Sequence, residues 1–153
     1  MSNLIGGEEV AHIEALASMD NWEQFMEFAS DQIDQAIPDQ SQSYKLKLAY
    51  EELISNIIRA TNKDLLAGTT PASLEILALK NVWDGHNVFV LRTQDTGPHF
   101  DPHFADRDSV DIDQPVHERQ IGGLGLFLIQ QSVDYVAYDW IDEKNTYDLC
   151  MKI

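Results

Sequence analysis

The sequence predicts an α+β protein, a two-layer sandwich in which helices cover one face of a mixed, mostly antiparallel sheet. Three observations predict this fold class. Helical periodicity dominates the first half of the chain, alternating strand patterns dominate the second, and one apolar helix interrupts the late strands. A chain of 153 residues can bury one sizeable core and has no room for a second full domain, so we expect a single domain over residues 1–153.

The first half is expected to contain a strand and two helices. Residues 9–19 mix apolar and polar side chains and are interpreted as the first strand, with a short helix as the alternative. Apolar residues then recur at helical spacing from Trp22 to Ile37. Ser41 to Ser43 is interpreted as a polar link that caps a second helix, Tyr44 to Thr61. The predicted apolar stripe of this second helix comprises Tyr44, Leu48, Leu53, Ile54, Ile57 and Ile58.

The second half is expected to supply most of the sheet. Asp84-Gly85 is a hairpin signal between two alternating segments, which are therefore predicted to be antiparallel neighbours. A buried helix is expected to end at Val133. The predicted strands are Ser73–Val82, Asn87–Thr93, Tyr135–Ile141 and Thr146–Ile153, with a turn at Asp142–Asn145 before the last of them.

Charge and composition restrict the function. Twenty-six acidic residues against ten basic ones give a formal charge of −16, a surface that repels nucleic acid. A bound polyphosphate would need a divalent cation and backbone donors to offset that field. The chain has no apolar run long enough for a bilayer and no signal-peptide pattern, so we expect a cytoplasmic protein that is not bound to a membrane. Cys150, the only cysteine, is expected to be a buried thiol.

A glycine-rich segment gives the first site candidate. Gly122, Gly123 and Gly125 run directly into the apolar helix that ends at Val133. Glycine lets main-chain N–H groups approach a ligand closely, and a helix N-terminus carries unpaired donors and partial positive charge. The segment therefore suits phosphate, although a tight loop packed under a core helix accounts for it equally well.

A polar pair on the second helix gives another candidate. Glu52 and Asn56 are four residues apart and so project from one face, with the small Ala49 and Ala60 on either side. Small neighbours would leave room for a ligand. A solvated helix surface is the alternative interpretation.

A third candidate is the turn that follows the strand ending near Thr93. Asp95-Thr96-Gly97-Pro98 can hold a carboxylate rigidly at a strand end; a plain β-turn is the alternative. The triplet Asp-Thr-Gly also occurs in aspartic proteases, but Pro98 replaces the small residue that usually follows it. With one copy of the triplet, a protease in a chain this acidic would also need a symmetric dimer.

Residues 103–120 have the composition of a mobile surface loop. They lack the glycine and terminal glutamate of a calcium loop. His99 and His103 would form a metal-ligand pair only on a helix, which the nearby prolines disfavour. A loop just before a phosphate-type glycine turn is well placed to act as a lid.

Taken together, three segments closely resemble the three ATP-binding boxes of the Bergerat-fold (histidine kinase-like) ATPases. They are Glu52-Leu53-Ile54-Ser55-Asn56, then Asp95-Thr96-Gly97 with Phe100-Asp101-Pro102, then Gly122-Gly123-Leu124-Gly125-Leu126-Phe127-Leu128-Ile129. Phe-Asp-Pro and the third segment look most like the bacterial anti-sigma factor serine/threonine kinases. The resemblance spans about residues 44–153. It departs from the family at two places. The histidine that is usual near the end of the second helix is absent from that position, and Thr96 stands where asparagine is common.

The resemblance implies a role for each matched residue. Asn56 would be a Mg²⁺ ligand and Glu52 the general base, while Asp95 and Gly97 would bind adenine. The glycine segment would present N–H groups to the phosphates of ATP, the lid would span about residues 98–120, and Thr146 would support the adenine subsite. The implied nucleotide-binding residues are Asn56, Asp95, Gly97, Arg119, Gly123, Leu124, Gly125 and Thr146.

The resemblance also implies the activity and the partners. A homodimeric, ATP-dependent protein kinase would bind a sigma factor and phosphorylate a serine of an anti-anti-sigma (STAS-type) protein. A non-catalytic module that uses ATP only to switch partners is the alternative, and retention of Glu52 favours catalysis over it. The catalytic half of a histidine kinase is disfavoured, because the chain has no room for a dimerisation helix pair with a phosphoacceptor histidine.

Overall fold

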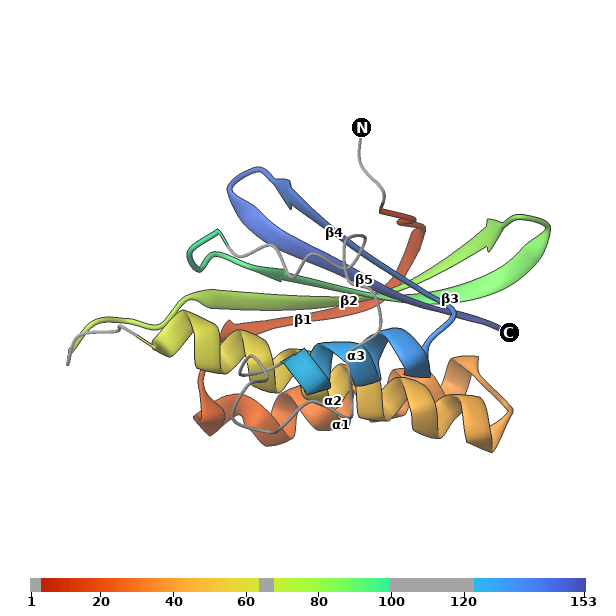
Figure 1. The fold of residues 1–153 in the computed structure, drawn as a ribbon, viewed down its shortest axis with the longest axis horizontal. Helices are drawn as coiled ribbons and strands as arrows, with labels where there is room; N and C mark the ends of the chain where they lie inside the picture. The colour runs from red at the N-terminus through yellow and green to blue at the C-terminus, as the bar shows by residue number, and fades with distance from the viewer. Residues whose placement is uncertain (1–3, 64–67, 100–122) are drawn as a thin grey trace.

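The computed structural model describes residues 4–63, 68–99 and 123–153, with only the backbone described for residues 123–126. The elements are β1 (Glu8–Leu16), the 3-10 turn η1 (Met19–Asn21), α1 (Trp22–Ala36), α2 (Gln40–Asn62), β2 (Ser73–Trp83), β3 (His86–Asp95), α3 (Gly123–Ser132), β4 (Tyr135–Ile141) and β5 (Lys144–Lys152). One sheet has the strand order β1-β2-β3-β5-β4, and α1, α2 and α3 lie against one face of it (Figure 1). The expected α+β sandwich is confirmed. Each neighbouring pair of described strands is antiparallel, so the mixed character that we expected is not found among them.

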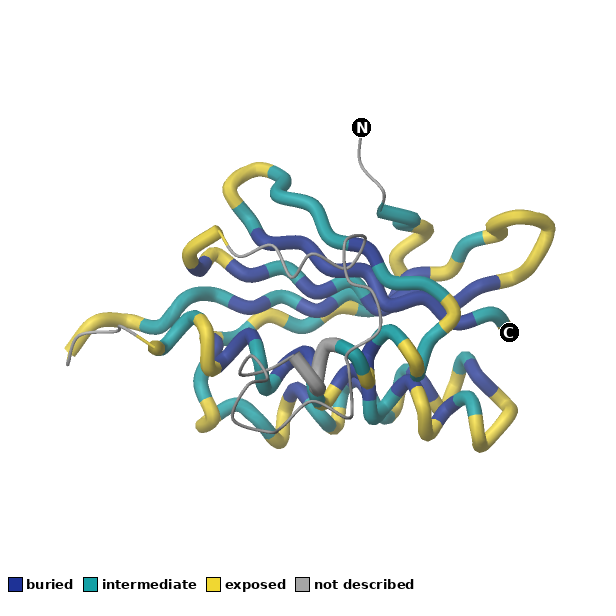
Figure 2. Tube along the Cα trace, in the orientation of Figure 1, coloured by how far each residue is buried: buried dark blue, intermediate teal, exposed yellow. Residues whose placement is uncertain are grey.

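Alternation along the strands builds two cores of different size. Phe89 and Leu91 of β3 point toward the helices and join the main apolar core, whereas Val88 and Val90 join a small cluster on the opposite face. Buried positions follow the middle of the strands and the helix sides that face them (Figure 2). Cys150 belongs to the small cluster, and burial raises the pKa of its thiol to about 12. The expected buried thiol is therefore confirmed.

Two tight hairpins set the order of the strands. Asp84 and Gly85 both have positive φ, 52° and 75°, as the predicted turn between β2 and β3 requires. Asp142 and Glu143 join β4 to β5 with φ values of 52° and 62°. Because β5 also pairs with β3, the polar ends of β3, β5 and β4 lie next to one another at one edge of the sandwich.

The start of α2 differs from the prediction. The helix begins at Gln40, because Asp39 Oδ1 accepts a hydrogen bond from the N–H of Gln42 at 2.9 Å and so caps it. The segment Ser41–Ser43 is thus part of the helix and not a link. The longer helix turns Ser43 toward the core, while Tyr44, which we expected in the apolar stripe, is 66% exposed.

The described residues before β1, which include Ile5 and Gly6, lie against the sheet face opposite the helices (Figure 1). Asp148 is fully buried there, and its Oδ2 accepts hydrogen bonds from the backbone N–H groups of Ile5 and Gly6. Arg92 donates to the same carboxylate at 2.8 Å and 2.9 Å. The hydrogen bond with Asp148 raises the pKa of Arg92. Within the described ranges, none of the helices combines the length and apolar character needed to cross a bilayer.

Candidate functional site

One end of the sandwich brings together the ends of four elements. β3 ends at Asp95, and its register with β5 places Asn145 directly opposite. Asn145 in turn pairs with Trp140 near the end of β4. The last turn of α2 reaches the same place, since a Cβ atom added to Gly97 would lie only 2.5 Å from Thr61 Cγ2. The end of α2 and the turn after β3 are therefore in contact.

Asp95 is a buried acid at the centre of this end. Its side chain faces the helices and is 1% exposed. Oδ1 accepts hydrogen bonds from the N–H of Gly97 at 2.9 Å and from Nδ2 of Asn145 at 3.0 Å. Burial raises the pKa of Asp95 above its ordinary value, while the two hydrogen bonds act in the opposite direction. A carboxylate held in this way can accept a further hydrogen bond from a ligand that excludes water.

Gly97 has a packing role that the sequence did not reveal. We predicted that it leaves space for a ring against the backbone. In the structure, Gly97 is buried against Thr61, and the same added Cβ atom would lie 3.0 Å from Asp95 Oδ1. Any side chain at this position would push the turn away from α2 and disturb the carboxylate, so glycine is required here for contact between the two elements.

Asn145 is the residue that the sequence analysis missed. Its Nδ2 donates to Asp95 Oδ1 and to the carbonyl oxygen of Pro98 at 2.8 Å. The neighbouring residue Thr146, which we expected in the adenine subsite, lies on the opposite face of the sheet, where its Oγ1 accepts a hydrogen bond from Gln94 Nε2 at 3.2 Å. Thr146 thus lies on the face away from Asp95, because adjacent residues of a strand point to opposite faces, and its place in the adenine subsite stays a prediction. Only the register between β3 and β5 identifies Asn145, and the sequence alone does not give that register.

Aromatic side chains extend this end of the sheet. Tyr138 stacks on His99 with ring centroids 6.2 Å apart, and Trp140 lies 4.7 Å from the same imidazole. Tyr138 also contacts Tyr147 at 5.1 Å and donates its hydroxyl to Asn145 Oδ1 at 2.6 Å. β4 therefore contributes an aromatic surface beside the Asp95 network, on the same face of the sheet.

The predicted pair on α2 lies on the helix that leads into this end. Glu52 and Asn56 are both half-buried. At 1.5 Å per residue, Asn56 lies about 7.5 Å and Glu52 about 13.5 Å back along the helix axis from Thr61. The three positions thus span a length comparable to that of a nucleoside triphosphate. Asn56 Nδ2 is buried and has no hydrogen-bond partner; among the described side chains Thr93 Oγ1 is the other such atom.

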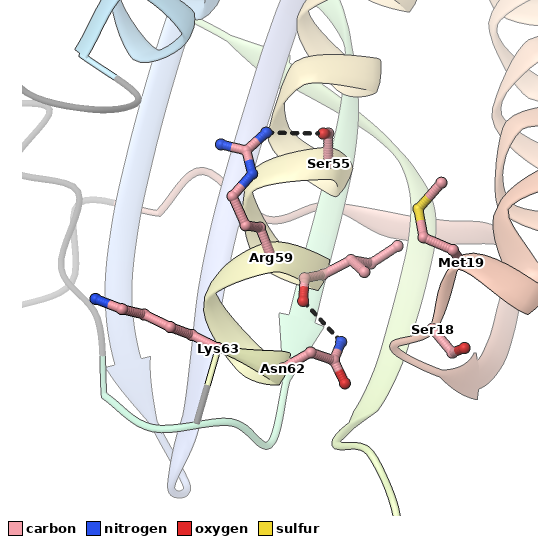
Figure 3. Close-up of a pocket in the computed structure, with 7 residues that line it drawn as sticks. Ser18, Met19, Ser55, Arg59, Asn62 and Lys63 are labelled. Carbon is pink, nitrogen blue, oxygen red and sulfur yellow. Dashed lines mark hydrogen bonds between the residues drawn. The ribbon is translucent and has the colours of Figure 1, made fainter. Parts of the chain in front are cut away.

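Arg59 connects Asn56 to a separate hollow on the flank of α2. Its Nη1 donates to Asn56 Oδ1 at 3.2 Å and its Nη2 to Ser55 Oγ at 3.3 Å. Figure 3 shows Arg59 lying along the helix toward Ser55, with Met19 projecting from the facing segment. The hollow has a volume of about 440 Å³ and is lined by Ser18, Met19, Ser55, Ile58, Arg59, Asn62 and Lys63. Neither Asp95 nor Asn56 lines it.

The glycine segment enters the site as the start of a helix. α3 begins at Gly123, so Leu124 and Gly125 belong to its first turn. α3 packs beside α2, and its N-terminus points toward the end of the sheet that carries Asp95 (Figure 1). The first turn of a helix offers unpaired N–H groups that suit phosphate. Arg119 and the greater part of the predicted lid, residues 98–120, fall outside the described residues.

Comparison with protein families decides the identity of the domain. The model of the histidine kinase-like ATPase domain matches residues 15–152, nearly the whole chain. The chain belongs to this family. The histidine kinase-like ATPase domain accounts for the α+β sandwich and for ATP as the expected ligand. A search of curated proteins finds no significant match.

Proposed function

We propose that this ATPase domain is an ATP-dependent anti-sigma factor serine/threonine kinase, acting as a homodimer, which sequesters a sigma factor and phosphorylates a STAS-type anti-anti-sigma protein on a serine. Membership of the family supports ATP binding. The observation that carries the site is the convergence of Asp95, α2 and the first turn of α3 at one end of the sandwich.

In this proposal the base of ATP lies against the Asp95 network. Adenine carries an exocyclic amine, a donor that matches a buried carboxylate. Such a hydrogen bond to a charged group stabilises a complex by about 1.5–3 kcal/mol. The aromatic residues Tyr138 and Trp140 lie beside this carboxylate and would help to exclude water from it.

The phosphates would extend from Asp95 along α2 to the first turn of α3. The N–H groups of Gly123 and Gly125 would donate to phosphate oxygens there. Asn56 is a described residue suited to Mg²⁺, since its amide Oδ1 supplies a hard oxygen, while its unpaired Nδ2 is a donor that would face a phosphate oxygen beside the ion. The described residues hold no cluster of three or more metal-binding side chains, which fits a Mg²⁺ ion held mainly by phosphates and water. When bound, Mg²⁺ neutralises the charge that develops on the phosphates.

Glu52 would act as the general base of the transfer. Its carboxylate accepts the proton of the substrate serine while the serine Oγ forms a bond to the γ-phosphorus. The bond between that phosphorus and the β,γ-bridging oxygen breaks, and ADP leaves with the electron pair. Removing a general base costs about 10²–10⁴ in rate.

The experiment measures transfer of the γ-phosphate from ATP to a STAS-type protein of the same organism. We expect Glu52→Gln to lower the transfer rate at least about 100-fold. Glu51→Gln is the matched control, because Glu51 is exposed one residue earlier on the same helix. Equal rates in both variants would contradict the assignment of Glu52, and the absence of transfer by the native chain would contradict kinase activity.

One observation favours the non-catalytic alternative, a module in which ATP only switches partners. Arg59 donates to Asn56 Oδ1, the atom proposed to face Mg²⁺. While Arg59 holds this oxygen, Asn56 does not offer it to Mg²⁺, the ion that phosphoryl transfer requires. A switch of this kind would retain ATP binding and release of a bound sigma factor, without phosphorylation of any partner. Nucleotide-dependent release with no phosphoserine in the partner, checked by mass spectrometry, would support the switch over the kinase.

A further inference from the structure

Asn145 holds one particular oxygen of Asp95. Within the described part of the chain, both hydrogen bonds to Asp95 reach Oδ1, one from Asn145 Nδ2 and one from the N–H of Gly97. A carboxylate can accept at both oxygens. Oδ2 is thus the oxygen that remains to accept a hydrogen bond from a ligand, and Asn145 is the side chain that, together with the N–H of Gly97, holds Oδ1 in place.

The amide of Asn145 is itself fixed in orientation. Its Nδ2 also reaches the carbonyl oxygens of Pro98 at 2.8 Å and Gly97 at 3.5 Å, groups that only accept hydrogen bonds. On the other side, the Tyr138 hydroxyl donates to Asn145 Oδ1 at 2.6 Å. A rotated amide would place an acceptor against two carbonyl groups and a carboxylate. The network therefore runs in one direction, from Tyr138 through Asn145 to Asp95.

We propose that Asn145 is a positioning residue that presents Asp95 Oδ2 to the exocyclic amine of a purine and so sets the preference of the site for adenine. The proposal rests on the ATP site described above. Asn145 need not touch the nucleotide. It acts on selectivity through the carboxylate, and Tyr138 supports it from the neighbouring strand.

A purely structural role makes a different prediction. If Asn145 only fastened the turn after β3, its loss would weaken all purine triphosphates equally. If it positions Asp95, its loss should weaken ATP far more than an analogue whose purine has hydrogen in place of the 6-amino group. The ratio of the two affinities therefore separates positioning from general support.

The test measures the affinities of ATP and of purine riboside triphosphate, which lacks that amine, by isothermal titration. The native chain should prefer ATP by about 10-fold or more, the value of one hydrogen bond to a charged group. Asn145→Ala should bring the ratio close to one. Tyr138→Phe keeps the ring contacts with Tyr147 and His99, and should lower the ratio by a smaller factor.

The outcomes separate the two proposals. If the native chain binds neither triphosphate, the ATP site fails and the role of Asn145 fails with it. If the native chain prefers ATP and both variants keep the full preference, only the role of Asn145 is overturned. Should Asn145→Ala fail to fold, Tyr138→Phe still decides the matter, since it removes a single hydroxyl: a lowered ratio supports the proposal and an unchanged ratio overturns it.

Discussion

Replacing Asp95 with asparagine should separate ligand binding from stability. The substituted side chain would keep an amide oxygen as acceptor for Gly97 and Asn145, and it would put an NH₂ group where Asp95 has Oδ2. A donor would then face the amine of adenine. Loss of a hydrogen bond to a charged acceptor costs about 1.5–3 kcal/mol, which is about a 10-fold to 150-fold loss of ATP affinity.

The same substitution should stabilise the ligand-free protein at neutral pH. Burial raises the pKa of Asp95 above its ordinary value of 3.8, so the folded state binds more protons than the unfolded state above that pH. Ionised Asp95 therefore lowers the free energy of unfolding as the pH rises. The stability gain of Asp95→Asn should be absent below about pH 4 and should grow above it.

Titration calorimetry with ATP and thermal unfolding between about pH 3.5 and about pH 7.5 test both effects. Unchanged ATP affinity would refute the adenine assignment. A gain in stability that does not depend on pH would refute the explanation from the buried charge. A variant that binds ATP weakly and is also less stable at every pH would show that Asp95 mainly supports the fold.

Four further substitutions, one of them a control, test contacts around the site and the sheet. Gly97→Ala should cost about 1–3 kcal/mol of stability through overpacking against Thr61, and Thr61→Ser, which removes Cγ2, should recover most of it in the double variant; additive effects in urea unfolding would contradict this contact. Asp148→Ala should cost about 3–5 kcal/mol because it leaves Arg92 and two backbone N–H groups without their carboxylate. Asp34→Ala, which removes the exposed pair with Lys47, is its control and should leave the melting temperature nearly unchanged; an equal loss in both would contradict the importance of burial.

Local patterns predicted most of the secondary structure. Asp84-Gly85 identified the hairpin between β2 and β3, because few residues besides glycine, asparagine and aspartate accept the positive φ that such a turn needs. The start of α2 was missed for a local reason as well. Ser41 to Ser43 was interpreted as a polar link that caps the helix, yet the side chain of Asp39 caps it one turn earlier than expected.

The site was predictable only where its residues act within one segment. Asp95 and Gly97 share a turn, and Glu52 and Asn56 share a helix face, so their spacing made them candidates and the family resemblance gave each of them a role. The role of Asn145 depends on the register of β5 with β3, which lies 50 residues away along the chain. A shift of one residue in that register exchanges Asn145 and Thr146 between the two faces. The family resemblance therefore pointed to the neighbouring residue, Thr146.

The most direct measurement of the nucleotide site is a map of backbone amide NMR shifts on addition of ATP with Mg²⁺. If ATP lies between Asp95, α2 and the start of α3, the largest shifts should fall on Asn56, Gly97, Asn145 and Gly123–Gly125. Shifts gathered instead on Met19, Arg59 and Lys63, around the hollow in Figure 3, would contradict that location.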